Sequence, residues 1–211
     1  DTTRIVSAKP TILKVLEDGG SCILMSHLGR PKAQEPAFSL RHIVSTLETI
    51  LGVNVIFSSN CIGEEAQKAS ANLKPGEVLL LENLRYHPEE TQGDLNFAES
   101  LSKLGDFYIN DAFGTAHRAH ASTAVLAKYF PINKCYGLLL ASEIKNIHKV
   151  LTDSEKPVTA IIGGAKVSSK ITIIESILDK IDHLIIGGGM VYTFTKALGG
   201  KVGNSICEPD Y

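Results

Sequence analysis

Short apolar runs without polar alternation recur along the chain and constrain its fold more than any other feature. Before residue 110 they occupy residues 22–25, 53–57, 78–81 and 107–109. Segments with apolar residues at helical spacing separate them, most clearly at 39–51 and 96–104. Strands of this kind are typical of parallel sheets covered on both faces, so the pattern predicts an α/β fold built from βαβ units.

Helix boundaries are also marked in the sequence. Ser39 is a favoured N-cap residue, and Gly52 is a favoured end for the helix that follows it. A helix near the start of the chain ends at Gly19-Gly20, with Pro10 either kinking it or lying in its first turn. Further helices are expected at 64–71 and 142–151.

A second series of strands and helices follows a polar stretch that ends in Pro157. It has apolar runs at 158–162 and 184–186, with a helix up to about Lys180 between them. With only about 55 residues, this series is too short to bury its faces alone. We therefore expect a lobe at 1–140, a connecting helix and linker at 141–154, and the start of a second lobe at 155–211.

Composition excludes several classes of protein. A formal charge of -2 and the lack of aromatic residues among basic runs argue against binding to nucleic acid. The four cysteines are far apart, so we expect buried, reduced thiols rather than a zinc site or disulfides. No run approaches the ~20 apolar residues of a membrane span, and no signal peptide opens the chain, so we expect a cytosolic protein without a membrane partner.

Basic side chains follow three of the predicted strands. The segments are Ser26-His27-Leu28-Gly29-Arg30-Pro31, Glu82-Asn83-Leu84-Arg85-Tyr86-His87 and residues 110–120, which include His117, Arg118 and His120. Parallel sheets bind ligands at the carboxyl ends of their strands, and an arginine fork pairs with carboxylate or phosphate. The pattern favours a site for a small polyanion. Solvated surface arginines are the alternative, and a histidine metal site lacks further ligands at suitable spacing.

In the second series, two lysines and a pair of glycines follow the first strand. Lys166 and Lys170 are four residues apart, which would place them on one face at the start of a helix, where they would repel each other. A phosphate between them, at a helix N-terminus, would relieve that repulsion, and Gly163 and Gly164 would let it approach the backbone. The alternative is a packed glycine turn. Neither a Walker A loop nor a dinucleotide fingerprint is present, since Gly187-Gly188-Gly189 completes neither motif.

Taken in order, these segments resemble phosphoglycerate kinase along nearly the whole chain. The resemblance is carried by residues 26–31, by Leu81-Glu82-Asn83-Leu84-Arg85, by residues 110–120, by Ile162-Gly163-Gly164-Ala165-Lys166-Val167 with Lys170, and by Ile185-Ile186-Gly187-Gly188-Gly189-Met190. It implies two Rossmann-like three-layer lobes with parallel sheets, joined by the helix at 142–151 and separated by a cleft. The second lobe is incomplete in this chain.

The resemblance also implies an activity. It is reversible phosphoryl transfer between 1,3-bisphosphoglycerate and ADP, which gives 3-phosphoglycerate and ATP, with Mg2+ on the nucleotide and a monomeric enzyme. The residues that match the phosphoglycerate site are Arg4, Ser26, His27, Gly29, Arg30, Arg85, His117 and Arg118. Those that match the nucleotide site are Gly163, Gly164, Ala165, Lys166, Lys170, Gly187, Gly188 and Gly189.

Within this set we expect Arg4 and Lys170 to be catalytic, by neutralising the transferring phosphoryl group while Lys166 and Mg2+ share its charge. A carboxylate is already a nucleophile near neutral pH, so positioning and charge neutralisation would carry the rate, and closure of the lobes would exclude water.

The departures from the family are omissions. Its first strand, with an Asp and an Asn beside the substrate, would precede Asp1, and the later glycine-rich loops and acidic residues would follow Tyr211. The 211 residues are therefore not expected to turn over alone. A non-catalytic module that binds phosphometabolites is the alternative function. A nicotinamide-dependent dehydrogenase is disfavoured because no dinucleotide fingerprint follows any strand.

Overall fold

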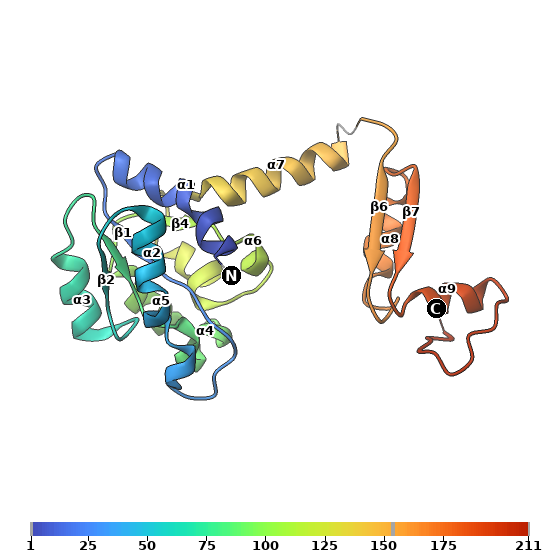
Figure 1. Ribbon diagram of the computed structural model, residues 1–211, viewed down its shortest axis with the longest axis horizontal. Helices are drawn as coiled ribbons and strands as arrows, with labels where there is room; N and C mark the ends of the chain where they lie inside the picture. Colours follow the sequence, from blue (N-terminus) through green and yellow to red (C-terminus); the bar gives the residue numbers. More distant parts are fainter. Residues whose placement is uncertain (1, 153–154, 211) are drawn as a thin grey trace. The chain divides into compact units, whose positions relative to one another are not determined.

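The computed structural model describes residues 2–152 and 155–210 (Figure 1). The chain divides into two compact units, Asp1–Glu143 and Ile144–Tyr211. The boundary falls inside helix α7, Leu138–Thr152, which begins four residues before the helix predicted at 142–151. Of the expected linker at 141–154, positions 153 and 154 lie outside the described residues.

The strands of the first unit form two parallel sheets. Strands β1 (Cys22–Leu24), β3 (Val78–Leu80) and β2 (Val55–Phe57) lie in that order, with Leu24 and Phe57 both opposite Leu80. Strand β4 (Tyr108–Asn110) pairs separately with β5 (Lys134–Tyr136). Parallel pairing is confirmed. Strands β1, β2 and β3 are slightly shorter than predicted, and β4 is shifted by one residue from 107–109. Strand β5 was not predicted, because its three residues are exposed and show no apolar run.

The helices of the first unit connect these strands (Figure 1). The α-helices are α1 (Thr3–Glu17), α2 (Val44–Leu51), α3 (Gly63–Ala71), α4 (Pro88–Gln92), α5 (Leu95–Ser102) and α6 (Phe113–Ala116). Turns of 3-10 helix occupy Pro36–Phe38, Leu40–Ile43, Leu84–Tyr86 and Leu126–Lys128, and Ala121–Val125 is a π-helical turn.

The predicted boundaries at Ser39 and Gly52 are confirmed. The Ser39 hydroxyl accepts a hydrogen bond from the Arg41 N–H, although the segment opens as a 3-10 turn before it becomes α2. Gly52 ends α2 in the left-handed region, with φ +73°, where a side chain would be strained. Pro10 lies inside α1 rather than in its first turn.

Strand β3 is the centre of the first unit. Its three side chains are 0–1% exposed and alternate between two apolar clusters. Leu79 packs with residues such as Phe97 and Leu101 of α5, whereas Val78 and Leu80 pack with residues of α1 and α2. The β1-β3-β2 sheet is therefore covered on both faces, as its uninterrupted apolar runs predicted. Each fully buried side chain of this size contributes about 1.5–3 kcal/mol of stability.

The second unit has a core on only one side of its sheet. Strands β6 (Thr159–Gly163) and β7 (His183–Gly187) are parallel, and helices α8 (Ile171–Leu178) and α9 (Val191–Ala197) follow them. Ile174 of α8 is buried with Val167 and Met190 against one sheet face. On the other face, the paired residues Ile161 and Ile185 are 75% and 51% exposed. This series does not bury both faces of its sheet, as its length indicated.

The cysteines are free, but the prediction that they are buried holds fully only for Cys61. Cys22 and Cys207 are half-buried, and Cys135 is exposed because β5 lies at the edge of its sheet. Burial raises the pKa of the Cys22 thiol to about 11. None of the helices in 2–152 and 155–210 combines the length and apolarity needed to cross a membrane.

Candidate functional site

The loop after β1 is fastened to the end of β3 by a buried amide. Asn83 is 0% exposed, and its side-chain nitrogen donates to the carbonyl oxygens of Leu28, at 2.8 Å, and Phe38, at 2.9 Å. The Leu84 N–H also donates to the Ser26 carbonyl, at 3.1 Å. These bonds hold the two strand ends together, so the residues that follow β1 and β3 share one edge of the sheet.

Gly29 and Arg85 meet at this edge. Arg85 Nη1 donates to the Gly29 carbonyl oxygen at 2.7 Å, which leaves other guanidinium donors available. Gly29 has φ +63°, and a Cβ there would collide with the ring of Phe38. Gly29 is thus required by the backbone of the loop, whatever it contributes to a ligand.

Glu82 holds the opposite side of the same loop. It is 8% exposed, and its carboxylate accepts hydrogen bonds from Ser39 Oγ at 2.6 Å, Leu40 N at 2.7 Å and Asn83 N at 2.8 Å. A buried carboxylate is tolerated when donors satisfy its oxygens. The Glu82 carboxylate therefore stabilises the loop through these hydrogen bonds.

A second buried carboxylate holds the segment after α6. Glu90 is 4% exposed and accepts hydrogen bonds from the N–H and hydroxyl of Ser122, at 3.0 and 2.7 Å. His120 Nδ1 lies 3.6 Å from Glu90 Oε1. Thr123 Oγ1 also donates to the Arg118 carbonyl, at 2.9 Å. The backbone around Arg118 is therefore fixed, while its guanidinium lies next to the ring of His117, with Nε to Nε2 at 3.5 Å.

The electrostatics show that these basic groups gather around His27. Burial, together with the charges of Arg85, Arg4, Arg118 and His120, lowers the pKa of His27 to about 4. Desolvation lowers the pKa of Arg85, as do Arg118 and Arg30, against an opposing effect of Glu90. We call the set Arg4, His27, Arg30, Arg85, His117 and Arg118 the basic patch.

The basic patch has a local excess of positive charge. Among the described residues, no carboxylate forms an ion pair with any of its four arginines. Arg4 and Arg30 are exposed, and Arg85 and Arg118 are half-buried. Like charges held this close are unfavourable without a counter-ion, so the arrangement suits a small polyanion. Ser26, also predicted for this site, is exposed beside His27.

In the second unit, the structure corrects the predicted arrangement of the lysines. Helix α8 begins at Ile171, so Lys166 lies in the preceding loop and Lys170 at the N-cap position, and the two do not share a helical face. Lys166 is exposed, and the stem of Lys170 passes over Gly164, where a Cβ would lie 3.4 Å from Lys170 Cε. The predicted repulsion between them on one helical face was therefore wrong, although both residues precede the first turn of α8.

The glycines near the ends of β6 and β7 differ in the space around them. Gly188 has φ +72°, and a Cβ there would lie 2.8 Å from the Gly164 carbonyl oxygen, which itself accepts from Met190 N at 2.9 Å. A Cβ at Gly189 would lie 2.9 Å from the Ile206 side chain. Gly164, Gly188 and Gly189 therefore form a packed glycine turn, which was the alternative to a phosphate site in the sequence interpretation. Gly163 and Gly187 are the last residues of β6 and β7, and a Cβ on Gly187 would meet open space. The exposed Ala165 follows the turn.

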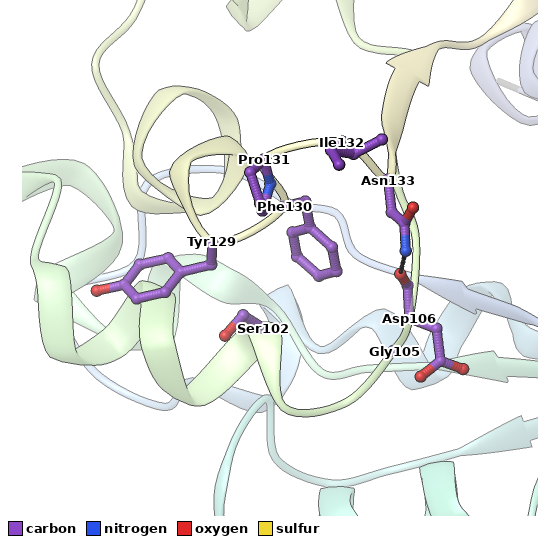
Figure 2. Close-up of a pocket in the computed structure, with 8 residues that line it drawn as sticks. All are labelled: Ser102, Gly105, Asp106, Tyr129, Phe130, Pro131, Ile132 and Asn133. Carbon is purple, nitrogen blue, oxygen red and sulfur yellow. Dashed lines mark hydrogen bonds between the residues drawn. The ribbon is translucent and has the colours of Figure 1, made fainter.

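Two pockets lie elsewhere in the first unit. Figure 2 shows a pocket of about 350 Å³ lined by Phe130, Pro131 and neighbouring residues, with Asn133 donating to the Asp106 carbonyl across one side. Asp106 and Asn133 precede β4 and β5, so the pocket lies at the amino ends of these strands. Another, of about 330 Å³, is lined by His87 and Phe97 among others. Neither includes a residue of the basic patch.

The family model described as phosphoglycerate kinase matches residues 1–211. The chain belongs to the phosphoglycerate kinase family. It is 53% identical over 211 residues to the phosphoglycerate kinase of Moorella thermoacetica, covering all of this chain and 53% of the relative. It is 50% identical over 210 residues to a cytosolic phosphoglycerate kinase of Triticum aestivum, covering 100% of this chain and 52% of the relative.

The solved structures agree. The phosphoglycerate kinase of Coxiella burnetii superimposes with a TM-score of 0.81 at 39% sequence identity, over 100% of this chain and 52% of that one. The predicted α/β class with open parallel sheets is therefore confirmed. The chain spans about half the length of the curated phosphoglycerate kinases that it matches.

The residues that support the site were not predicted from the sequence. Asn83 lies within a motif but had no predicted role, and no pattern distinguishes Glu90 or Glu208. The hydrogen bonds of these two carboxylates reach across 32 and 40 residues. No local spacing rule identifies such partners, because the fold alone brings them together.

Proposed function

We propose that the full-length protein catalyses reversible phosphoryl transfer between 1,3-bisphosphoglycerate and ADP, giving 3-phosphoglycerate and ATP. The observation that carries this proposal is the convergence of Arg4, Arg85 and Arg118 around His27, with Arg30 close to Arg85, in a chain of the phosphoglycerate kinase family. A phosphoglycerate carries a phosphate and a carboxylate, and both are suited to arginine forks.

In this proposal the first unit binds the phosphoglycerate. Arg30, Arg85 and Arg118 bind its phosphate oxygens, and neutral His27 donates one hydrogen bond to the ligand. The substrate carboxylate is the nucleophile towards ATP and is already ionised at neutral pH, so no general base is needed. The first unit therefore serves to orient that carboxylate.

The second unit binds the nucleotide. The open space over Gly187 lets a ligand approach the backbone, and Lys166 and Lys170 supply charge to its phosphates. Arg4 and Lys170 neutralise the charge of the transferring phosphoryl group. The described residues contain no cluster of three or more His, Cys, Asp or Glu side chains suited to a metal. In this proposal Mg2+ comes with the nucleotide, where it would neutralise phosphate charge.

We further propose that the protein works as a monomer in the cytosol on small-molecule substrates. Support comes from the free cysteines, which suit a reducing compartment, and from the cytosolic phosphoglycerate kinase of Triticum aestivum among its relatives. Size-exclusion chromatography with light scattering tests the oligomeric state, and a dimer mass would contradict a monomer.

A coupled assay of the full-length protein with ATP and 3-phosphoglycerate tests the activity. Turnover that depends on both substrates is the expected result. Binding of 3-phosphoglycerate without ATP-dependent turnover would instead indicate a non-catalytic module that binds phosphometabolites.

Two variants test the division of roles. Lys170→Ala should lower kcat by about 100-fold or more while leaving the dissociation constant of 3-phosphoglycerate unchanged. Arg118→Ala should weaken 3-phosphoglycerate binding by about tenfold or more. Lys180→Ala serves as the control for a lysine beyond α8, outside both sets of site residues. The reverse pattern of effects in the two site variants would overturn the assignment.

A further inference from the structure

A carboxylate from a distant part of the chain holds the loop that carries both lysines of the second unit. Glu208 follows α9, in a stretch without helix or strand. Its carboxylate accepts two hydrogen bonds from Ser168, one from the backbone N–H at 3.0 Å and one from the hydroxyl at 2.6 Å. Ser168 lies between Lys166 and Lys170, so the contact is made in the centre of the loop.

Glu208 is itself anchored. Its backbone N–H donates to Thr193 Oγ1 at 3.1 Å, and Thr193 is 3% exposed in α9. Hydrogen bonds from the Ser168 hydroxyl and N–H, together with the charge of Lys166, hold the pKa of Glu208 below its ordinary value. Both hydrogen bonds from Ser168 are therefore charge-assisted at neutral pH, which makes them stronger than bonds to a neutral acceptor.

The loop has further supports before and after Ser168, and Ser169 Oγ donates to the Lys166 carbonyl at 2.9 Å. Before it, the Gly164 carbonyl accepts from Met190 N, and the Val167 side chain is 3% exposed in the core. After it, the Lys170 N–H donates to the Val167 carbonyl at 2.8 Å. Ser168 is half-buried, and the carboxylate of Glu208 accepts from both of its hydrogen-bond donors, the N–H and the hydroxyl.

We propose that Glu208 is a positioning residue for nucleotide binding. By holding Ser168 it fixes the backbone between Lys166 and Lys170, so both amines are directed at the phosphates before the nucleotide arrives. A loop ordered in advance loses less conformational entropy on binding, which raises affinity. The inference rests on the proposed function, because it assigns these lysines to a nucleotide.

The test compares four variants of the full-length protein with wild type. They are Glu208→Gln, Ser168→Ala, the double variant, and Glu175→Gln as a matched control. Glu175 is exposed on α8, and its side chain makes no hydrogen bond or ion pair with other described residues. Calorimetry gives the dissociation constant of ATP, and the coupled assay gives kcat and KM for each substrate.

Glu208→Gln should raise the dissociation constant and KM of ATP by about tenfold, the expected effect of losing charge-assisted hydrogen bonds. Ser168→Ala should have a smaller effect, because the backbone N–H remains. The double variant should resemble Glu208→Gln rather than the sum, because both residues act through one contact. Glu175→Gln should match wild type, and KM for 3-phosphoglycerate should stay constant throughout.

Three results would overturn the inference. Tighter ATP binding by Glu208→Gln would mean that the carboxylate competes with phosphate for Ser168. Equal losses of affinity for ATP and 3-phosphoglycerate, with a lowered Tm, would mean that the contact between Glu208 and Ser168 is merely structural. If Glu208→Gln has the same dissociation constant and KM for ATP as Glu175→Gln, Glu208 does not position the lysines. If the wild-type protein neither binds ATP nor catalyses the reaction, the proposed function itself fails. This outcome is distinguishable because wild type is measured before any variant.

Discussion

At the scale of single residues, His27 shows how the basic patch is prepared for an anion. Its folded-state pKa is about 4, against an ordinary value of 6.5, because burial and the neighbouring arginines oppose a further positive charge. The imidazole is therefore neutral at physiological pH. A neutral ring can donate one hydrogen bond to a ligand without adding to the repulsion among the arginines.

The first prediction concerns stability and pH. Because the pKa of His27 is lower in the folded state, the unfolded chain binds more protons between pH 6.5 and 4, and stability falls as pH is lowered through this range. The His27 side chain is partly exposed, so solvent screening reduces the effect to about 1–2 kcal/mol. Urea denaturation should show a smaller loss for His27→Gln than for wild type. Replacing the exposed His183 by Gln is the control, and an equal slope in both variants would contradict the account.

The second prediction concerns protons taken up on binding. A bound polyanion offsets the charges of Arg85, Arg4 and Arg118, so it should raise the pKa of His27 from about 4 towards its ordinary value. Binding of 3-phosphoglycerate near pH 5 should then take up a fraction of a proton. Calorimetry in two buffers of different ionisation enthalpy measures that fraction. Uptake that persists in His27→Gln would show that another group is responsible.

How far single residues could be predicted depended on their neighbours in the sequence. The arginines were predictable because each of Arg30, Arg85 and Arg118 follows a strand, and parallel strands end at one edge. The arrangement of Lys166 and Lys170 was not predictable, because α8 begins only at Ile171, after both lysines. The close packing of Gly188 was not predictable either, because its contact with Gly164 exists only in the folded chain.

At the scale of elements, the start of α7 is set by tertiary contacts. Asp111 Oδ2 accepts from Thr11 Oγ1 at 2.6 Å, and Oδ1 accepts from Leu140 N at 2.9 Å. The Leu138 N–H donates to Thr11 Oγ1 at 2.9 Å. Free N–H groups at a helix start need such acceptors. Because the acceptors lie 29 and 127 residues away, the sequence pattern placed the helix start too late.

The third prediction tests this cap. Asp111→Ala should lower the free energy of unfolding by about 1–2 kcal/mol, because two N-terminal N–H groups of α7 lose a direct or indirect acceptor. The exposed Asp106 offers a matched control, since its contact to Asn133 uses the backbone carbonyl. Thermal or urea denaturation measures the difference. Equal stability of Asp111→Ala and Asp106→Ala would show that the cap contributes nothing.

Gly137 gives a fourth prediction at the same place. An added Cβ would collide with the side chain of Asp111, so Gly137→Ala must displace the carboxylate that caps α7. It should destabilise the protein by about as much as Asp111→Ala, and the double variant should be close to either single one. In contrast, a Cβ on Gly114 meets nothing within 4 Å, so Gly114→Ala is the control. Additive losses in the double variant would contradict this coupling.

At the scale of the whole molecule, the two units differ in how fully they bury their sheets. In the first, β3 is buried on both faces, whereas the second leaves Ile161 and Ile185 exposed side by side. Composition and periodicity predicted the parallel α/β architecture of both. They did not predict that the strands of the first unit form two sheets, since strand order and gaps arise from packing of the whole chain.

The fifth prediction follows from the uncovered face of β6 and β7. The 211-residue chain should bind a hydrophobic dye such as anilinonaphthalene sulfonate at this face. Replacing Ile161 and Ile185 together by Thr should reduce the fluorescence with little change in stability, because these side chains are already exposed. Ile132, 87% exposed in the first unit, provides the control substitution. Unchanged fluorescence would show that the dye binds elsewhere.

The central claim is that the basic patch binds the phosphoglycerate, and calorimetric titration of 3-phosphoglycerate into the full-length protein tests it most directly. The double variant Arg30→Ala with Arg118→Ala removes two guanidinium groups of the patch, whereas Arg41→Ala removes one that lies over the ring of Phe57, with Cζ 4.4 Å from the ring centre. We predict that the double variant binds about 100-fold more weakly than wild type and that Arg41→Ala binds as wild type does. Equal affinities for the double variant and wild type would contradict the account.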